Sequence, residues 1–356
     1  FGVAASAYVA RLGGPQISWY WYGLLLWIVV SIFGYFHVEV SARVLLVAMA
    51  IEIIVVLVFD FAIFSGRTAP SGGITLEPFS WHAISGGVWS IGLLFALLMF
   101  NGFEGTAAFR EEVRDPARTI GRATLFVVAF VGIFFFFATW ALLSYFGTDQ
   151  AHKLGVSDPV GMFATALSGS VGNWLVSVAG VLLFTSIFAA TVSIHSILSR
   201  YIFSLGVDRV LPARFGAVHP RHKSPYIAAA GASALFLLAE LPFVLTDADA
   251  TALYGQLGGT GGYAYLLLFT LDSLAVLVYF RRQRGAHSAG IWVSTVAPIV
   301  SLIAMATLLV VGIQNFTTLT GGSGVFAFVL QAVVWGSAVL GITLALIYRK
   351  KRPDAY

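Results

Sequence analysis

Residues 100–105 read Phe-Asn-Gly-Phe-Glu-Gly, and they hold the polar groups in this chain that are best suited to binding chemistry. They follow a helix-length apolar run that begins at Ile84. An acidic side chain such as Asp at the centre of a bilayer costs about 2.5–3.5 kcal/mol on insertion scales, and a helical glycine costs about 1 kcal/mol relative to alanine. Membrane proteins keep such breaks mainly where irregular backbone lines a cavity. The segment therefore predicts a helix break that binds a ligand; the alternative is a kinked structural helix from which Glu104 snorkels.

A second carboxyl, Glu52, lies near the middle of the apolar segment 42–64. At that depth a carboxyl is protonated, paired or in contact with water, because a bare charge in hydrocarbon is costly. Glu52 is therefore either a group that takes up and releases a proton or a neutral acid bonded to a neighbouring helix. Asp60 lies nearer the outer end of the same segment, and we expect it at the membrane interface.

His195 is the only histidine deep inside an apolar segment. A lone buried histidine is typical of a hydrogen-bonded structural residue rather than of a ligand. Here, however, Ser193, Ser196 and Ser199 make the surrounding helix polar enough to border a cavity. Ser193 and His195 are therefore candidates for substrate binding.

Motifs of nucleotide-dependent and hydrolytic enzymes are absent from the sequence. The glycine-rich run 258–262 opens an apolar segment with no preceding strand, so we interpret it as a flexible helix start rather than a phosphate loop. The chain has no cysteine, which excludes thiolate metal sites, and its remaining histidines form no metal-ligand motif. We expect no enzymatic activity, no metal and no cofactor.

Composition places these groups in a membrane protein. Hydrophobic residues make up 59% of the chain and charged residues 10%, whereas soluble domains have about 25% charged residues. The mean hydropathy is +0.90. Each of nine apolar segments is near or above the ~20 residues that a membrane-spanning helix needs, so the sequence predicts an all-α polytopic membrane protein embedded in a lipid bilayer. The segments are 19–36, 42–64, 84–109, 122–146, 173–203, 226–245, 261–280, 291–313 and 325–348.

Basic residues alternate between the two sides of this predicted bundle. Of the 20 Lys and Arg residues, 17 fall on one side, and only Arg11, Arg67 and Lys153 fall on the other. By the positive-inside rule the richer side is cytoplasmic, which places the C-terminus inside and Phe1 outside the cytoplasmic membrane. Topology therefore explains the net charge of +4, and we expect no nucleic-acid partner.

Three blocks of the sequence resemble the amino acid permeases of the amino acid–polyamine–organocation (APC) superfamily. Residues 100–120, with Phe-x-Gly-x-Glu and then Glu-Glu-Val-Arg-Asp-Pro-x-Arg-Thr-Ile, are similar to the family's sixth helix and following loop. Residues 199–225, with Ser-Arg-Tyr-Ile-Phe-Ser-Leu-Gly-x-Asp-x-Val-Leu-Pro and His-Pro-Arg-x-x-Ser-Pro, are similar to the eighth helix and its cytoplasmic extension. Residues 37–44, His-Val-Glu-Val-Ser-Ala-Arg-Val, resemble the link between helices four and five. The blocks occur in the family's order.

The resemblance implies the five-plus-five inverted-repeat transporter fold with two extra C-terminal helices. In this register the nine apolar segments are similar to family helices four to twelve. Residues 1–356 are then one transmembrane transporter domain that lacks the first three family helices. Because the family binds the substrate carboxylate at its first helix, we expect residues 1–356 alone not to transport.

The activity that the resemblance implies is secondary active transport of amino acids or related amines by alternating access. Glu104 would be the gating or proton-linked carboxyl, and Glu52 stands where some proton-coupled members have a lysine. With two intramembrane carboxyls, we expect coupling to protons rather than to sodium. A membrane scaffold or sensor that keeps the fold without transport is the alternative. The residues that would line the substrate site at the break are Phe100, Asn101, Gly102 and Phe103.

Overall fold

The computed structural model of the chain describes residues 1–11, 14–15, 17–36, 42–66, 70, 72–85, 89–106, 113–158, 161–246, 248–283, 290–322 and 324–351. Within these ranges the regular secondary structure is helical, without strands, which confirms the predicted all-α class. Residue contacts divide the chain into two compact units. The first consists of Phe1–Ile84 and Glu104–Asp247, and the second of Ser85–Phe103 and Ala248–Tyr356.

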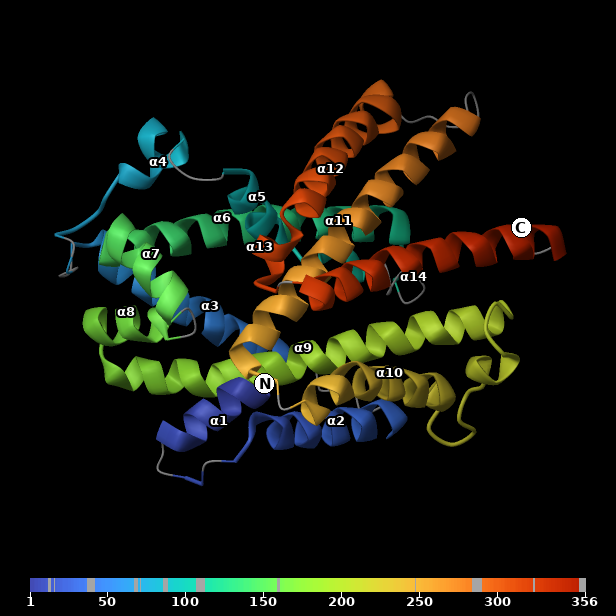
Figure 1. Cartoon of the computed structure of the whole chain (residues 1–356), viewed down its shortest axis with the longest axis horizontal. Coiled ribbons are helices and arrows are strands. Elements are labelled where there is room, and N and C mark those ends of the chain that lie inside the picture. Colours follow the sequence, from blue (N-terminus) through green and yellow to red (C-terminus); the bar gives the residue numbers. More distant parts are fainter. Residues whose placement is uncertain are drawn as a thin grey trace. The chain divides into compact units, whose positions relative to one another are not determined.

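The first unit packs around the long helix α9, which runs from Asn173 to Val207 and contacts α2, α3, α8 and α10 (Figure 1). Its core joins Phe59 and Ile63 to Tyr145 and Leu167, all of which are buried. The other helices of this unit are α1 (Gly2–Arg11), α2 (Trp19–Phe36), α3 (Ala42–Phe64), η1 (Glu77–Phe79), α4 (Trp81–Ser85), α6 (Pro116–Phe146), α7 (Thr148–Ser157), α8 (Met162–Ser170), η3 (Ala213–Gly216) and α10 (Tyr226–Leu245).

The second unit is built on α11 and α12, which lie side by side in Figure 1. The fully buried Tyr263 is at its centre. Its ring packs on Phe316 with 5.0 Å between centroids, and its hydroxyl accepts a 2.7 Å hydrogen bond from Trp335 Nε1. The helices of this unit are α5 (Trp89–Leu98), α11 (Ala250–Arg282), the π-helix η4 (Trp292–Val296), α12 (Ala297–Gln314), α13 (Phe316–Thr320) and α14 (Gly324–Lys351).

Eight helices in the described part of the chain are long and apolar enough to cross a membrane. Large apolar side chains on their outer faces are exposed, as expected for helices that face lipid; Phe61 is 74% exposed and Phe328 is 71% exposed. The ninth predicted segment, 84–109, differs because its regular helix α5 covers only Trp89–Leu98. Within the described residues 89–106, the run therefore contains a short helix followed by turns.

The structure corrects the expectation that the glycine-rich run 258–262 is the start of a helix. The run lies inside α11, which begins eight residues earlier at Ala250. Asp249 is the N-cap, and its carboxylate accepts a 2.7 Å hydrogen bond from the Ala252 amide. A capping side chain at this position stabilises the first helical turn, so the helix begins where the cap is rather than where the glycines are.

Candidate functional site

The predicted helix break is present. The α5 helix ends at Leu98, residues 99–102 form turns, and residues 103–106 form a 3-10 turn. Gly102 has φ of 108°, a backbone conformation that is accessible to glycine and strained for other residues. The segment that is richest in polar groups therefore coincides with the point where the helix is interrupted.

On the second unit, the residues of the break contact α11. Phe103 stacks on Phe269, with 5.5 Å between ring centroids and an interplanar angle of 22°. Asn101, Gly262 and Tyr265 lie around a small pocket beside these rings. Its volume of about 10 Å³ is far below the range of about 300–1,000 Å³ that is usual for ligand sites. The amide and the phenol supply hydrogen-bonding groups within an otherwise apolar lining.

On the first unit, Glu52 is held against α9. The Ser186 hydroxyl donates a 3.1 Å hydrogen bond to Glu52 Oε2, and Glu52 itself is half-buried. Ser193 follows Ser186 by seven residues, which is two helical turns, so both hydroxyls lie on the same face of α9. Glu52, Ser186 and Ser193 thus form one polar row.

The turn that carries Glu104 lies farther along that same face of α9. A Cβ added at Gly105 would be 3.2 Å from Ile197 Cδ1, so the turn packs closely on Ile197. Ile197 is four residues beyond Ser193 and eleven beyond Ser186, which keeps it on the polar row's face. Ser186 marks the height of Glu52 along α9, and Ile197 marks the height of the turn that carries Glu104. At a rise of 1.5 Å per residue, these two heights are separated by about 16 Å.

His195 lies elsewhere. It is 2% exposed, its Nε2 is 2.9 Å from Ser233 Oγ on α10, and its ring packs edge-on against Phe236. It also touches Gly34 of α2, where an added Cβ would be only 2.8 Å from His195 Nδ1. Residues two positions apart on a helix point in directions that differ by about 200°, so Ser193 and His195 face different sides of α9. These contacts suit the hydrogen-bonded structural reading of His195, and its role in substrate binding stays a prediction.

Two polar groups beside the predicted site residues were not identified from the sequence. Ser186 and Tyr265 were both missed, although Ser186 could have been found because it precedes Ser193 by two full turns. Tyr265 had no such signal, since only the contact between α5 and α11 places it next to Asn101. Among the described residues, no group of three His, Cys, Asp or Glu side chains could hold a metal ion. Carboxyls and hydroxyls along one helix face can exchange protons and bind a small polar solute.

Comparison with known proteins identifies a family and similar transporters. The profile of the amino acid permease family matches residues 1–355. The chain is 28% identical over 254 residues to the low-affinity putrescine importer PlaP of Escherichia coli (strain K12), a match that covers 70% of this chain and 51% of that protein. Two similar proteins of Bacillus subtilis (strain 168) are the branched-chain amino acid permease BcaP, 25% identical over 54% of this chain and 39% of that protein, and the glutamate/serine transporter AimA, 27% identical over 44% and 28%. The chain spans about half, or less, of the length of these curated relatives.

Proposed function

The chain belongs to the amino acid permease family, and we propose that it is a secondary active transporter of amino acids or related amines that works by alternating access. It is an all-α, multi-pass membrane protein. Its place in the cytoplasmic membrane, with the C-terminus on the cytoplasmic side, is part of the proposal and is supported by the 17 basic residues on one side.

The observation that carries this proposal is the interruption of α5. Unsatisfied backbone groups cost several kcal/mol each in hydrocarbon, so a break after Leu98 within an apolar segment is stable only where protein or a water-filled cavity surrounds it. Discontinuous helices in secondary transporters use such backbone groups to bind substrate and coupling ions. In this proposal Phe100, Asn101, Gly102 and Phe103 line the substrate site at the break.

Coupling to protons is the second part of the proposal. Glu104 is in the turn that follows the break, and Glu52 shares a hydrogen bond with Ser186 on the same α9 face. Carboxyls placed along one face can take up a proton on one side of the membrane and release it on the other. A sodium site would use several carbonyl and hydroxyl oxygens, which Ser186 and Ser193 could contribute only in part.

The names of the relatives limit the class of substrate but do not single out one compound. Their names specify putrescine, branched-chain amino acids, and glutamate with serine. An ammonium group is common to all of these compounds, whereas the α-carboxylate of the amino acids is absent from putrescine. We therefore propose an ammonium-bearing substrate, either an amino acid or a polyamine.

A ligand screen tests whether a binding site exists. The full-length natural protein that contains residues 1–356 is purified, and its melting temperature is measured with each of the twenty amino acids and with polyamines. A specific ligand at 100 times its Kd adds about 2.7 kcal/mol to stability, so one compound or a related few should raise the melting temperature. Asn101→Ala should abolish that shift, while Gln150→Ala, at an exposed amide on α7, should preserve it. A flat response across the panel would favour the scaffold or sensor alternative.

Single-cysteine labelling tests the proposed orientation, because residues 1–356 contain no cysteine of their own. Lys153 on α7 and Arg221 between α9 and α10 are both exposed. A membrane-impermeant maleimide added to intact cells should label Lys153→Cys, whereas Arg221→Cys should be labelled only after the cells are permeabilised. The reverse pattern would show that the orientation is inverted.

A further inference from the structure

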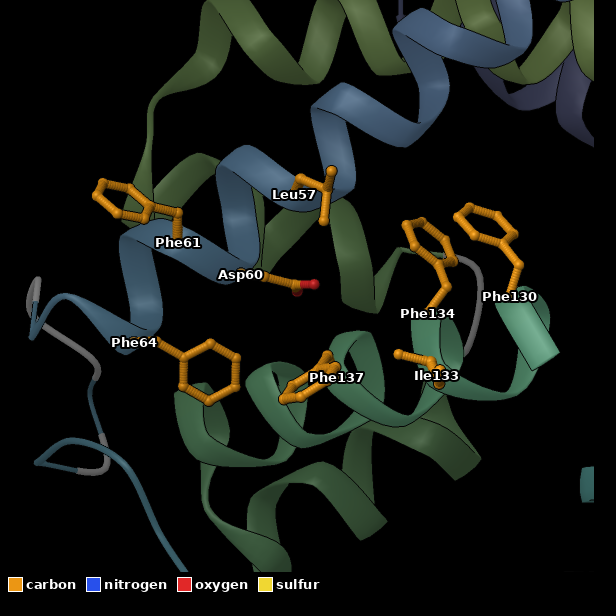
Figure 2. Close-up of a pocket in the computed structure, with 8 residues that line it drawn as sticks. All are labelled: Leu57, Asp60, Phe61, Phe64, Phe130, Ile133, Phe134 and Phe137. Atoms are coloured by element: carbon orange, nitrogen blue, oxygen red, sulfur yellow. The ribbon is translucent and has the colours of Figure 1, made fainter.

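A second cavity lies in the first unit, between α3 and α6 (Figure 2). Its volume is about 540 Å³, within the range of about 300–1,000 Å³ that is usual for small-molecule sites. Among the described residues, Asp60 and seven apolar side chains line it. None of its residues belongs to the site proposed for transport. The apolar lining consists of Leu57, Phe61, Phe64, Phe130, Ile133, Phe134 and Phe137.

Asp60 is the unusual feature of this cavity. It is only 5% exposed, and its expected depth at the membrane interface stays a prediction. Neither carboxylate oxygen has a hydrogen-bond partner among the described residues. Figure 2 shows the carboxyl directed from α3 into the space towards α6. Buried carboxylates are normally paired or hydrogen-bonded, since isolation from water is costly, so this group calls for a partner that the described protein does not supply.

The surrounding rings suit a positively charged partner. Five phenylalanines line the cavity. In Figure 2, Phe64 and Phe137 lie below the carboxyl, and Phe134, with Phe130 beyond it, lies to the right. The face of an aromatic ring is electron-rich and attracts cations, and aromatic cages commonly recognise organic ammonium groups. One carboxyl with several ring faces is therefore complementary to an ammonium head on a hydrophobic body.

We propose that the cavity between α3 and α6 binds a small hydrophobic ammonium ion, with the nitrogen at Asp60 and the apolar body among the phenylalanines. Other classes of ligand fit less well. A neutral apolar molecule would leave the carboxyl without a partner, and an anion would be repelled by it. A hard metal cation takes six or more oxygen ligands for Ca²⁺ or an octahedral set for Mg²⁺. Within the part of the lining that the structure describes, Asp60 is the only oxygen-bearing side chain.

Calorimetry on the full-length protein tests this site with two probes of one shape. 2-Phenylethylammonium carries the charge at neutral pH, and 2-phenylethanol does not. The charged probe should bind at least about tenfold more tightly, because charge-assisted contacts are the stronger ones. Asp60→Asn should remove that preference, and Phe137→Leu should weaken binding of the charged probe. Asp149→Asn, at an exposed carboxyl on α7, is the matched control and should bind like the unmodified protein.

Two further results decide the assignment. Asn101→Ala, in the site proposed for transport, should leave binding of 2-phenylethylammonium unchanged; loss of binding would show that the probe occupies that other site and would overturn the proposal. Equal affinity of the unmodified protein for the two probes would also overturn it. This comparison requires no variant, so it remains decisive even if Asp60→Asn fails to fold. A failure of the transport proposal would leave all of these expectations unchanged.

Discussion

Replacing Gly259 with alanine is expected to destabilise the second unit strongly, whereas the same change at Gly258 is expected to be tolerated. A Cβ at Gly259 would collide with the Leu319 carbonyl oxygen, and it would be 2.8 Å from the Leu319 carbonyl carbon and 2.9 Å from Thr320 Cα. All three atoms are backbone, so no side-chain rotation can relieve the contact. Overpacking of this kind costs about 1–3 kcal/mol, and occasionally more.

Gly258 provides the matched control within one helix. A Cβ added there meets nothing within 4 Å, and Gly→Ala at a compatible position stabilises a protein by about 0.4–1 kcal/mol. The measurement is the melting temperature of each purified variant in the same detergent. Gly259→Ala should melt several degrees below the unmodified protein and Gly258→Ala at or above it. Equal melting temperatures for the two variants would show that α11 and α13 are not packed as described.

Glu104→Gln and Glu52→Gln are each expected to abolish proton-driven accumulation of substrate. Glutamine keeps the size and hydrogen-bonding capacity of the side chain but cannot take up or release a proton in the physiological range. Ser186 Oγ can still donate to a glutamine oxygen at position 52, so the contact between α3 and α9 should survive. Substrate binding should therefore persist while uptake driven by a pH gradient is lost.

Glu77→Gln is the control for this pair. Glu77 is an exposed carboxyl in η1 that accepts a 2.8 Å hydrogen bond from the Thr148 hydroxyl, and it lies outside the long apolar helices. Its variant should accumulate substrate normally. Uptake driven by sodium at fixed pH, and unaffected by either intramembrane substitution, would refute proton coupling.

Local patterns in the sequence were sufficient to predict the break. Gly102 and Gly105 weaken a helix by their backbone freedom, and Glu104 resists burial, so three neighbouring residues point to the same outcome. The structure confirms that α5 ends at Leu98. The glycines at 258–262 gave the wrong expectation, because a glycine can serve close packing as well as flexibility. At Gly259 the neighbouring backbone comes from residues 60 and 61 positions later, which a local pattern cannot reveal.

Side-chain direction limited the prediction of individual site residues. Ser193 and His195 were grouped because they are close in sequence, yet the geometry of α9 turns them to different faces. The sequence located Asp60 near the outer end of an apolar segment but did not show that the folded chain buries its side chain. Its burial depends on α6, which packs beside it in the first unit. These features follow from which helices become neighbours, and hydropathy alone does not determine that choice.

Uptake into liposomes tests the proposed function most directly. The full-length natural protein that contains residues 1–356 is reconstituted, a pH gradient is imposed, and accumulation of labelled amino acids and polyamines is followed with and without a protonophore. At least one of these ammonium-bearing compounds should accumulate above the level in protein-free liposomes, and the protonophore should abolish that accumulation. Failure to accumulate any of them under a pH or a sodium gradient, in protein that also binds none of them, would contradict the assignment as a transporter.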